Sequence, residues 1–147
     1  MSHTSVSILT QHLKVQLAHL AVLRDYYKGD EKPYVKSALS FTIEDAQEAI
    51  ARVASRLRQL GHPLLNQSLD DAGDKLLRQA RSRRTTEDKL RFVHHGLKHQ
   101  LDWYGTHLKE LKDDADSQAI FVALAEQTRV RLDRWETLML ELKVPLD

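Results

Sequence analysis

The segment FVHHGLKHQLDWY, residues 92–104, carries three of the chain's eight histidines, at positions 94, 95 and 99. Histidine is a common metal ligand and a general acid or base near neutral pH. His95 and His99 are four residues apart, so on a helix their rings share a face and could chelate one metal ion. The familiar zinc motif of this spacing has a carboxylate between the histidines, whereas Lys98 lies here and would repel a cation. We therefore favour a solvated helix face, with a metal site at His95 and His99 as the alternative, and expect no cofactor.

His94 lies on a different face of the same helix, the one that also faces a possible pocket. It falls within a seam of apolar residues at three- and four-residue steps, so we expect a hydrogen-bonded histidine at the edge of the core. Other polar residues near inward faces are Gln16, Gln47, Arg129 and Glu136. They could converge on a small-ligand pocket, although a self-contained hydrogen-bond network is the more frequent outcome. Because the sequence shows no nucleophile–base pair and no phosphate-cradling loop, a non-catalytic role is favoured over an enzyme.

A carboxylate-bridged two-metal centre can also be tested against the sequence. Inside a four-helix bundle it needs a glutamate on two helices and Glu-x-x-His on the other two, all pointing inward. The carboxylates Glu44, Asp45 and Glu48 fall on the outward side of their helix. Glu126 is followed three residues later by Arg129 in place of histidine. The sequence therefore argues against an iron centre inside the bundle.

Four arginines cluster in the segment RQARSRR and could contact phosphates. They are Arg78, Arg81, Arg83 and Arg84. At a formal net charge of +1 for the whole chain, a solvated arginine-rich turn is the favoured interpretation. Weak, salt-sensitive DNA binding is the alternative.

Composition sets the broad class. The 147 residues fit a single domain, 1–147, and 41% hydrophobic with 29% charged residues is ordinary for a globular protein. The absence of cysteine excludes disulfides and thiolate metal sites. The N-terminal residues lack the pattern of a signal peptide, and no apolar run is long enough to span a membrane. We expect no membrane partner and, by default, a cytoplasmic location.

The elements that must position these residues are helices. Turn-forming segments at 28–33, 61–68, 82–86 and 112–117 leave four long helical stretches, at about 5–28, 33–60, 86–112 and 116–143. The first and last pairs are joined by short turns and should form antiparallel hairpins. The connection from Gly61 to Thr85 is long enough to cross the bundle, and its segment SLDDAGDKLLRQARS could form a short extra helix. The prediction is an all-α, ferritin-like four-helix bundle with a long crossover between helices 2 and 3.

The first helical stretch is apolar on two sides. One face, expected in the core, holds Leu9, Leu13, Leu17, Leu20 and Tyr27. The second stripe consists of Ile8, Val15 and Val22, with His12, His19 and Tyr26 beside them. A helix that is apolar on two sides is usually buried on two sides. We therefore expect the second stripe to form a subunit contact in a homo-oligomer, a dimer or larger.

Most of the chain resembles the Dps-type mini-ferritins, the DNA-protection-during-starvation proteins. The resemblance is carried by DYYKGDEKPYVKSALSFTIEDAQEAIARVASRLRQLGHPL and by LKDDADSQAIFVALAEQTRVRLDRWETLML. The first span contains an aromatic turn ending in a basic residue and Gly29, and a helix that closes on an arginine and a Leu-Gly-x-Pro-Leu sequence. The second resembles the acidic turn and last helix of the family. The resemblance implies the ferritin-like fold and a tendency to oligomerise.

The family oxidises iron between two subunits, with two histidines, an aspartate and a glutamate as ligands. Counted from the two matching glycines, these positions hold Arg24, Lys36, Ala51 and Ser55. None of these side chains resembles the family's iron ligands, and two would supply positive charge where the family binds iron. The sequence thus predicts a mini-ferritin relative without a ferroxidase centre, in a non-catalytic binding or structural role. The alternatives are a DNA-binding homologue and a bundle that binds a small ligand or a metal.

Overall fold

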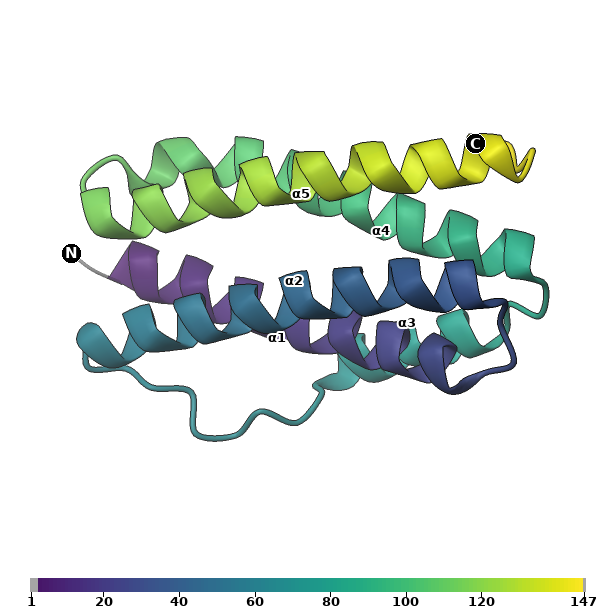
Figure 1. The fold of residues 1–147 in the computed structure, drawn as a ribbon. Coiled ribbons are helices and arrows are strands. Elements are labelled where there is room, and N and C mark those ends of the chain that lie inside the picture. Colours follow the sequence, from purple (N-terminus) through teal and green to yellow (C-terminus); the bar gives the residue numbers. More distant parts are fainter. Residues whose placement is uncertain (1–2, 147) are drawn as a thin grey trace.

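The computed structural model describes residues 3–146, which form long helices lying side by side (Figure 1). The long helices are α1 (His3–Lys28), α2 (Pro33–Gln59), α4 (Thr86–His107) and α5 (Ala115–Glu141). A shorter helix, α3 (Asp71–Arg81), lies within the connection from α2 to α4, and the 3-10 helix η1 (Leu108–Leu111) follows α4. α1 packs against α2, α4 packs against α5, and α3 packs against α1. No strand occurs within residues 3–146, so the prediction of an all-α chain with two hairpins is confirmed.

Local capping explains three of the helix ends that the sequence predicts. α4 starts after Thr85, whose Oγ accepts a hydrogen bond from the Asp88 N–H at 3.0 Å. The short helix expected in the connection starts after Asp70, whose carboxylate accepts from the Gly73 N–H at 2.8 Å. α2 ends just before Gly61, which has a φ of 80°. A glycine adopts this left-handed conformation without steric cost and so terminates the helix.

The C-terminal end of α4 differs from the prediction. The sequence pattern predicts one continuous helix to Lys112, whereas the α-helix stops at His107 and the chain continues as η1. The tighter 3-10 turn is a common way to finish a helix. The carbonyl of Leu108 accepts a hydrogen bond from Gln118 Nε2 at 2.9 Å. Gln118, near the start of α5, therefore supplies a hydrogen-bond donor to the backbone where α4 passes into η1.

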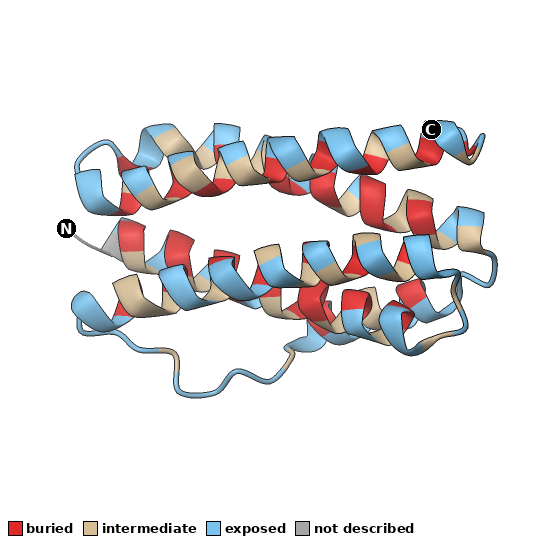
Figure 2. Ribbon diagram, viewed as in Figure 1, coloured by how far each residue is buried: buried red, intermediate tan, exposed pale blue. Residues whose placement is uncertain are grey.

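All four long helices carry buried residues, which lie mainly on the sides that face the neighbouring helices (Figure 2). They form two apolar clusters, one around Trp135 and the other around Phe121. Between the clusters, each long helix contributes a buried polar residue: Gln16, Thr42, Gln100 and Thr128. These four line an internal cavity of about 20 Å³, which is room for a single water molecule. The core is therefore two apolar halves with a polar layer between them.

The second stripe of α1 lies mostly inside the chain, which corrects the premise of the subunit contact. Ile8, His12, His19, Val22 and Tyr26 are buried within the chain, and α2, α3, α4 and η1 all pack against α1. Of the stripe, Val15 alone is largely exposed, at 42%. The sequence pattern could not separate burial by the crossover from burial by a partner subunit. These residues therefore give no reason to expect a subunit contact through α1.

The two tyrosines at the end of α1 exchange the positions that the pattern predicts. Tyr26, expected in the second stripe, is buried, and its hydroxyl donates to the Ala80 carbonyl at 2.8 Å. Tyr27, expected in the core, is exposed, and Lys36 Nζ lies 5.3 Å from its ring centroid. The reason is again α3, whose C-terminal turn supplies both a packing surface and a hydrogen-bond acceptor for Tyr26.

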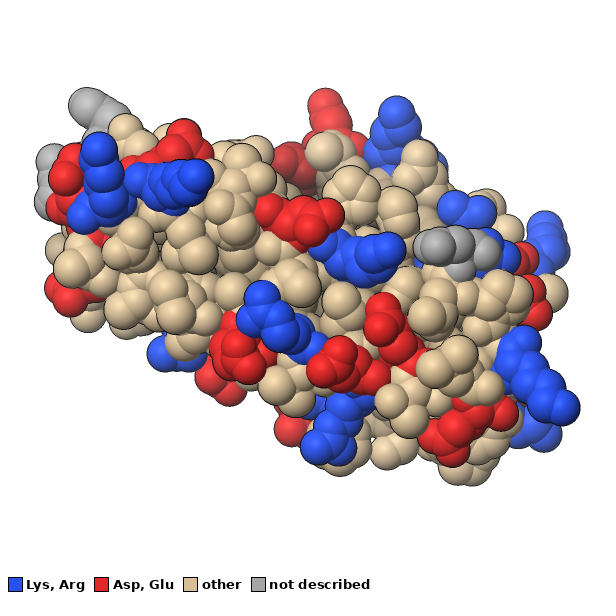
Figure 3. Space-filling view, turned by 90° about the horizontal axis from the view of Figure 1, so that it is seen from above, with Lys and Arg blue, Asp and Glu red and all other residues tan. Residues whose placement is uncertain are grey.

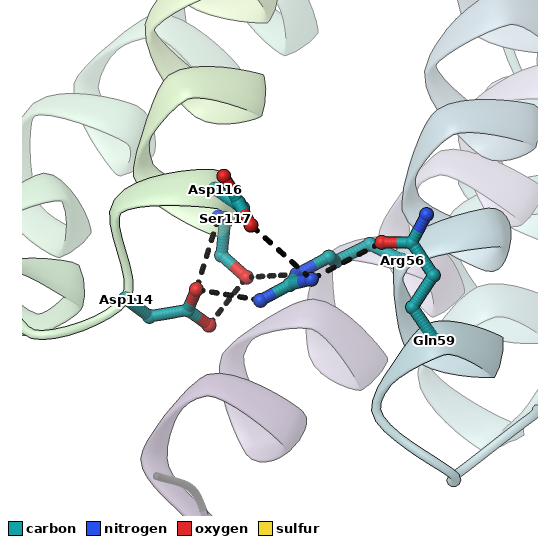
Figure 4. A network of polar contacts seen from close by, with 5 residues as sticks. All are labelled: Arg56, Gln59, Asp114, Asp116 and Ser117. Carbon is teal, nitrogen blue, oxygen red and sulfur yellow. Dashed lines mark hydrogen bonds and ion pairs between the residues drawn. The ribbon is translucent and has the colours of Figure 1, made fainter.

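A polar network ties α2 to the start of α5 (Figure 4). Arg56 Nη2 lies 2.7 Å from Asp114 Oδ1, and Arg56 Nε donates to Ser117 Oγ at 3.0 Å. Asp114 also caps α5 by accepting from the Ser117 N–H and hydroxyl. Burial by itself would raise the pKa of Asp114, but hydrogen bonds from Ser117, Ser5 and Arg56 outweigh it and lower the pKa to about 2. Each charge in this buried network has a partner.

Candidate ligand-binding groove

An open groove of about 950 Å³ runs between α1, α3 and α4. One edge of α4 forms its longest wall, with side chains at three- and four-residue steps: Asp88, Phe92, His95, His99 and Trp103. The opposite side consists of His12, Val15 and His19 of α1 with Leu76 and Gln79 of α3. Five of the eight histidines line this groove. Two helices distant in sequence thus bring together residues that no local motif connects.

The charged residues of the groove are mainly cationic. Arg83 and Arg91 lie at the end where α4 begins, together with Asp88, and Lys98 lies farther along α4. The Arg83 guanidinium lies 5.1 Å from the centroid of the Phe92 ring, a cation–π distance. Within residues 3–146, none of these three cations forms an ion pair. Their positive charge is therefore available to a ligand.

His12 lies at the other end of the groove, where one face of its ring and its Nε2 both have partners. It stacks on Trp103 with ring centroids 5.0 Å apart, and its Nε2 is 2.9 Å from the Tyr104 hydroxyl. Gln16 Nε2 joins this group at 3.4 Å from His12 Nε2. Burial, with a smaller contribution from His107, lowers the pKa of His12 to about 3. The ring is therefore neutral at pH 7, and this end of the groove carries aromatic surface without added charge.

His19 lines both the groove and the internal cavity, and so separates them. Its Nε2 is buried and has no hydrogen-bond partner within the described part of the chain. Burial lowers the pKa of His19 to about 4, so this ring is also neutral at pH 7. A Cβ at Gly96 would lie 3.2 Å from His19 Cε1. The absence of a side chain at Gly96 thus lets α4 approach the His19 ring closely.

The five polar residues expected near inward faces do not converge on one pocket. His94 is buried at the core edge, as expected, and its Nε2 lies 2.7 Å from Glu136 Oε2. Gln16 belongs to the polar layer of the core. Gln47 and Arg129 are exposed on the outside of their helices, and Arg129 pairs with Glu126 at 2.9 Å.

His95 and His99 lie on the outer rim of the groove. Their rings are exposed and meet edge to face, with centroids 4.6 Å apart. No group of three or more histidine, aspartate or glutamate side chains placed to hold a metal ion occurs among the described residues. A zinc site generally needs at least three protein ligands. The pair therefore contributes polar side chains to the groove rim.

The four positions matched to ferroxidase ligands contain no metal-binding group. Arg24 and Ala51 are exposed, and Ser55 is half-buried. Lys36 is half-buried against Tyr27. The donor set at these positions is thus two cations, a methyl group and a hydroxyl, which does not suit iron.

The arginine segment is divided among several contacts. Arg81 pairs with Asp25 at 3.2 Å, and Arg83 belongs to the groove, whereas Arg78 and Arg84 are exposed. On the face seen from above in Figure 3, basic and acidic side chains are interspersed. DNA binding through the arginine segment stays a prediction, and fewer of its arginines are free of other contacts than the sequence suggests.

None of the helices in residues 3–146 combines the length and apolar character needed to cross a membrane.

The groove itself was not predicted from the sequence. His12, Val15 and His19 lie at i, i+3 and i+7 on α1, and this spacing, next to a second histidine-rich helix, was the available signal. Comparisons of the chain with protein-family models, curated proteins and solved structures found no match.

Proposed function

We propose that this protein is a non-catalytic helical bundle whose groove between α1, α3 and α4 binds an organic anion with an apolar body. The observation that carries the proposal is one groove that combines an apolar wall with cations that form no ion pair among the described residues. Arg91 and Lys98 supply charge, and Phe92, Trp103 and Val15 supply apolar surface. The volume of about 950 Å³ lies within the range of ligand sites, roughly 300–1,000 Å³.

The surroundings of the buried histidines support binding over catalysis. His12 contacts the Tyr104 hydroxyl, which is the nearest group that could act as a nucleophile. Burial raises the pKa of Tyr104 above its ordinary value, while a hydrogen bond from Gln16 opposes this. The phenol therefore stays protonated near neutral pH, and a neutral His12 is too weak a base to activate it.

A fluorescent organic anion, anilinonaphthalene sulfonate, tests the proposal directly. We expect saturable, one-to-one binding that quenches tryptophan emission, because Trp103 lines the groove. Tryptophan emission alone does not locate the probe, because Trp135 Nε1 donates to the Leu90 carbonyl of α4 at 2.9 Å and so lies behind the same groove wall. Removing both groove cations in the double variant Arg91→Ala, Lys98→Ala should weaken probe binding. Non-saturable binding, or an unchanged affinity in that variant, would place the probe elsewhere and refute the proposal.

The ferritin-like classification and the relation to Dps-type mini-ferritins belong to the same proposal. They are supported by the order of the helices and by α3 within the long connection. Assembly into a homo-oligomer is proposed on the resemblance alone, because most of the second stripe of α1 is covered within the chain. A light-scattering mass in solution tests it, and a monomer at micromolar concentration would contradict it.

A further inference from the structure

We infer that the ligand of this groove is an extended long-chain carboxylate, bound with its head at Arg83 and Arg91 and its hydrocarbon chain running towards Trp103. The inference rests on the proposed function and names the ligand class for the same site. It follows from the shape of the groove, from the position of its charges and from the character of its far end.

The groove is long. Its α4 wall extends from Asp88 to Trp103, which corresponds to about 22 Å along a helix. An extended chain can contact the groove along this whole length, whereas a compact fused ring system would leave part of it unfilled.

The charges are unevenly distributed along this length. Arg83 and Arg91 lie together where α4 begins, and Asp88 offsets part of their charge. Lys98 lies about 10 Å farther along α4 and on the exposed rim. Two arginines can present several donors in fixed geometry to one carboxylate, whereas a rim lysine is a solvated point charge. The head group therefore belongs at the arginine end.

The opposite end favours a hydrocarbon chain. Trp103 covers His12 in a stacked arrangement, and His12 is itself held by the Tyr104 hydroxyl. Between the two ends, Val15 and Leu76 face the groove. Val15 is 42% exposed, and a bound chain would cover this apolar surface. Each methylene group removed from water should increase the affinity by up to about fourfold, until the chain reaches Trp103.

Displacement of anilinonaphthalene sulfonate by saturated carboxylates, at submicellar concentration, tests the length. We expect octanoate to displace the probe weakly, dodecanoate better, and hexadecanoate best. Hexadecanol, which lacks the charge, should bind about tenfold more weakly than hexadecanoate. Trp103→Ala should reduce the advantage of hexadecanoate over dodecanoate and leave octanoate unchanged.

Arg91→Ala and Lys98→Ala form a matched pair that tests the position of the head group. Both remove a cation from the same wall of the groove. Arg91→Ala should weaken hexadecanoate binding about tenfold and leave hexadecanol binding unchanged. Lys98→Ala should weaken hexadecanoate less than about threefold, as expected for a screened rim charge.

The outcomes separate the two proposals. If the probe binds but no carboxylate displaces it, or if affinity is independent of chain length, the ligand class is wrong and the anion-binding groove stands. If Arg91→Ala and Lys98→Ala have equal effects, the head group is not at the arginine end and the inference fails. If the probe itself does not bind the groove, the proposed function fails and this inference fails with it.

Discussion

The network around Arg56 and the groove between α1 and α4 both concentrate polar side chains, but they differ in how those side chains are paired. In the network, Arg56 contacts Asp114 at 2.7 Å, and Asp114 also receives hydrogen bonds from Ser117. In the groove, Arg91 has no ion pair and the buried His19 Nε2 has no hydrogen-bond partner within residues 3–146. A buried polar group without a partner costs free energy, so a protein retains few of them.

This difference indicates what each region does. A network whose members satisfy one another has no capacity left for a ligand, and its contribution is to fix α2 against the start of α5. Unpaired cations beside exposed apolar surface have that capacity. The same comparison explains why the arginine segment is a weak candidate for phosphate binding, since Arg81 is already occupied by Asp25. In this chain, whether a charged side chain already has a partner distinguishes structural residues from candidate binding residues better than the residue type does.

The largest effect should come from breaking the network. Arg56→Ala would leave the Asp114 carboxylate, which is 5% exposed, without its cation, and should lower the free energy of unfolding by about 3 kcal/mol. Thermal denaturation would show this as a decrease in Tm of roughly 10 °C. Because the pKa of Asp114 is lowered to about 2, its stabilisation is present above its ordinary pKa near 3.8 and is lost as the pH falls towards 2. The deficit of Arg56→Ala should therefore shrink over that pH range.

Arg52→Ala is the matched control, one turn earlier on α2. Arg52 pairs with Glu48 at 3.6 Å, and both side chains are about half exposed. A surface pair of this kind contributes roughly 0.3–0.5 kcal/mol. The groove variant Arg91→Ala should be similarly mild in stability, because it removes no ion pair. Equal destabilisation by Arg56→Ala and Arg52→Ala would show that the network does not fix α2 against the start of α5.

A smaller effect, visible with acid, should come from the unpartnered histidine. Burial lowers the pKa of His19 from its ordinary 6.5 to about 4. Between these two pH values, His19 binds a proton in the unfolded chain but stays neutral in the folded protein. The free energy of unfolding is therefore at its full value above pH 6.5 and decreases as the pH falls towards 4. His19→Leu should remove this loss, about 1.4 kcal/mol per pH unit. Urea denaturation of both proteins at pH 7 and pH 5 should show the variant retaining about 2 kcal/mol more of its stability. Parallel losses would mean that His19 is not held neutral by burial.

The sequence predicts the helices better than it predicts the groove, for reasons that particular residues show. Helix ends depend on local chemistry, such as the Thr85 hydroxyl on the Asp88 N–H, and this chemistry is readable from the chain. The path of the crossover is not local. Packing of α3 on α1 buries Tyr26 and exposes Tyr27, and it converts a predicted subunit surface into interior. His12 and Trp103 are 91 positions apart and stack only after the hairpins meet.

The smallest effects should come from two glycines of α4 that differ in what they face. Alanine is favoured over glycine in a helix by roughly 0.5–1 kcal/mol. A Cβ at Gly105 would meet nothing within 4 Å, so Gly105→Ala should stabilise the protein by that amount. A Cβ at Gly96 would lie 3.2 Å from Cε1 of His19, a buried ring with little freedom to move. Gly96→Ala should therefore gain nothing, or lose a few tenths of a kcal/mol.

The cause of that difference can be isolated with a double-mutant cycle. In a His19→Ala background the ring is absent, so Gly96→Ala should stabilise the protein as much as Gly105→Ala does. Urea denaturation of the single and double variants provides the coupling free energy between positions 19 and 96. If Gly96→Ala already matches Gly105→Ala in the unmodified chain, α4 does not approach His19 closely. The His19 ring would then have freedom to move away from position 96.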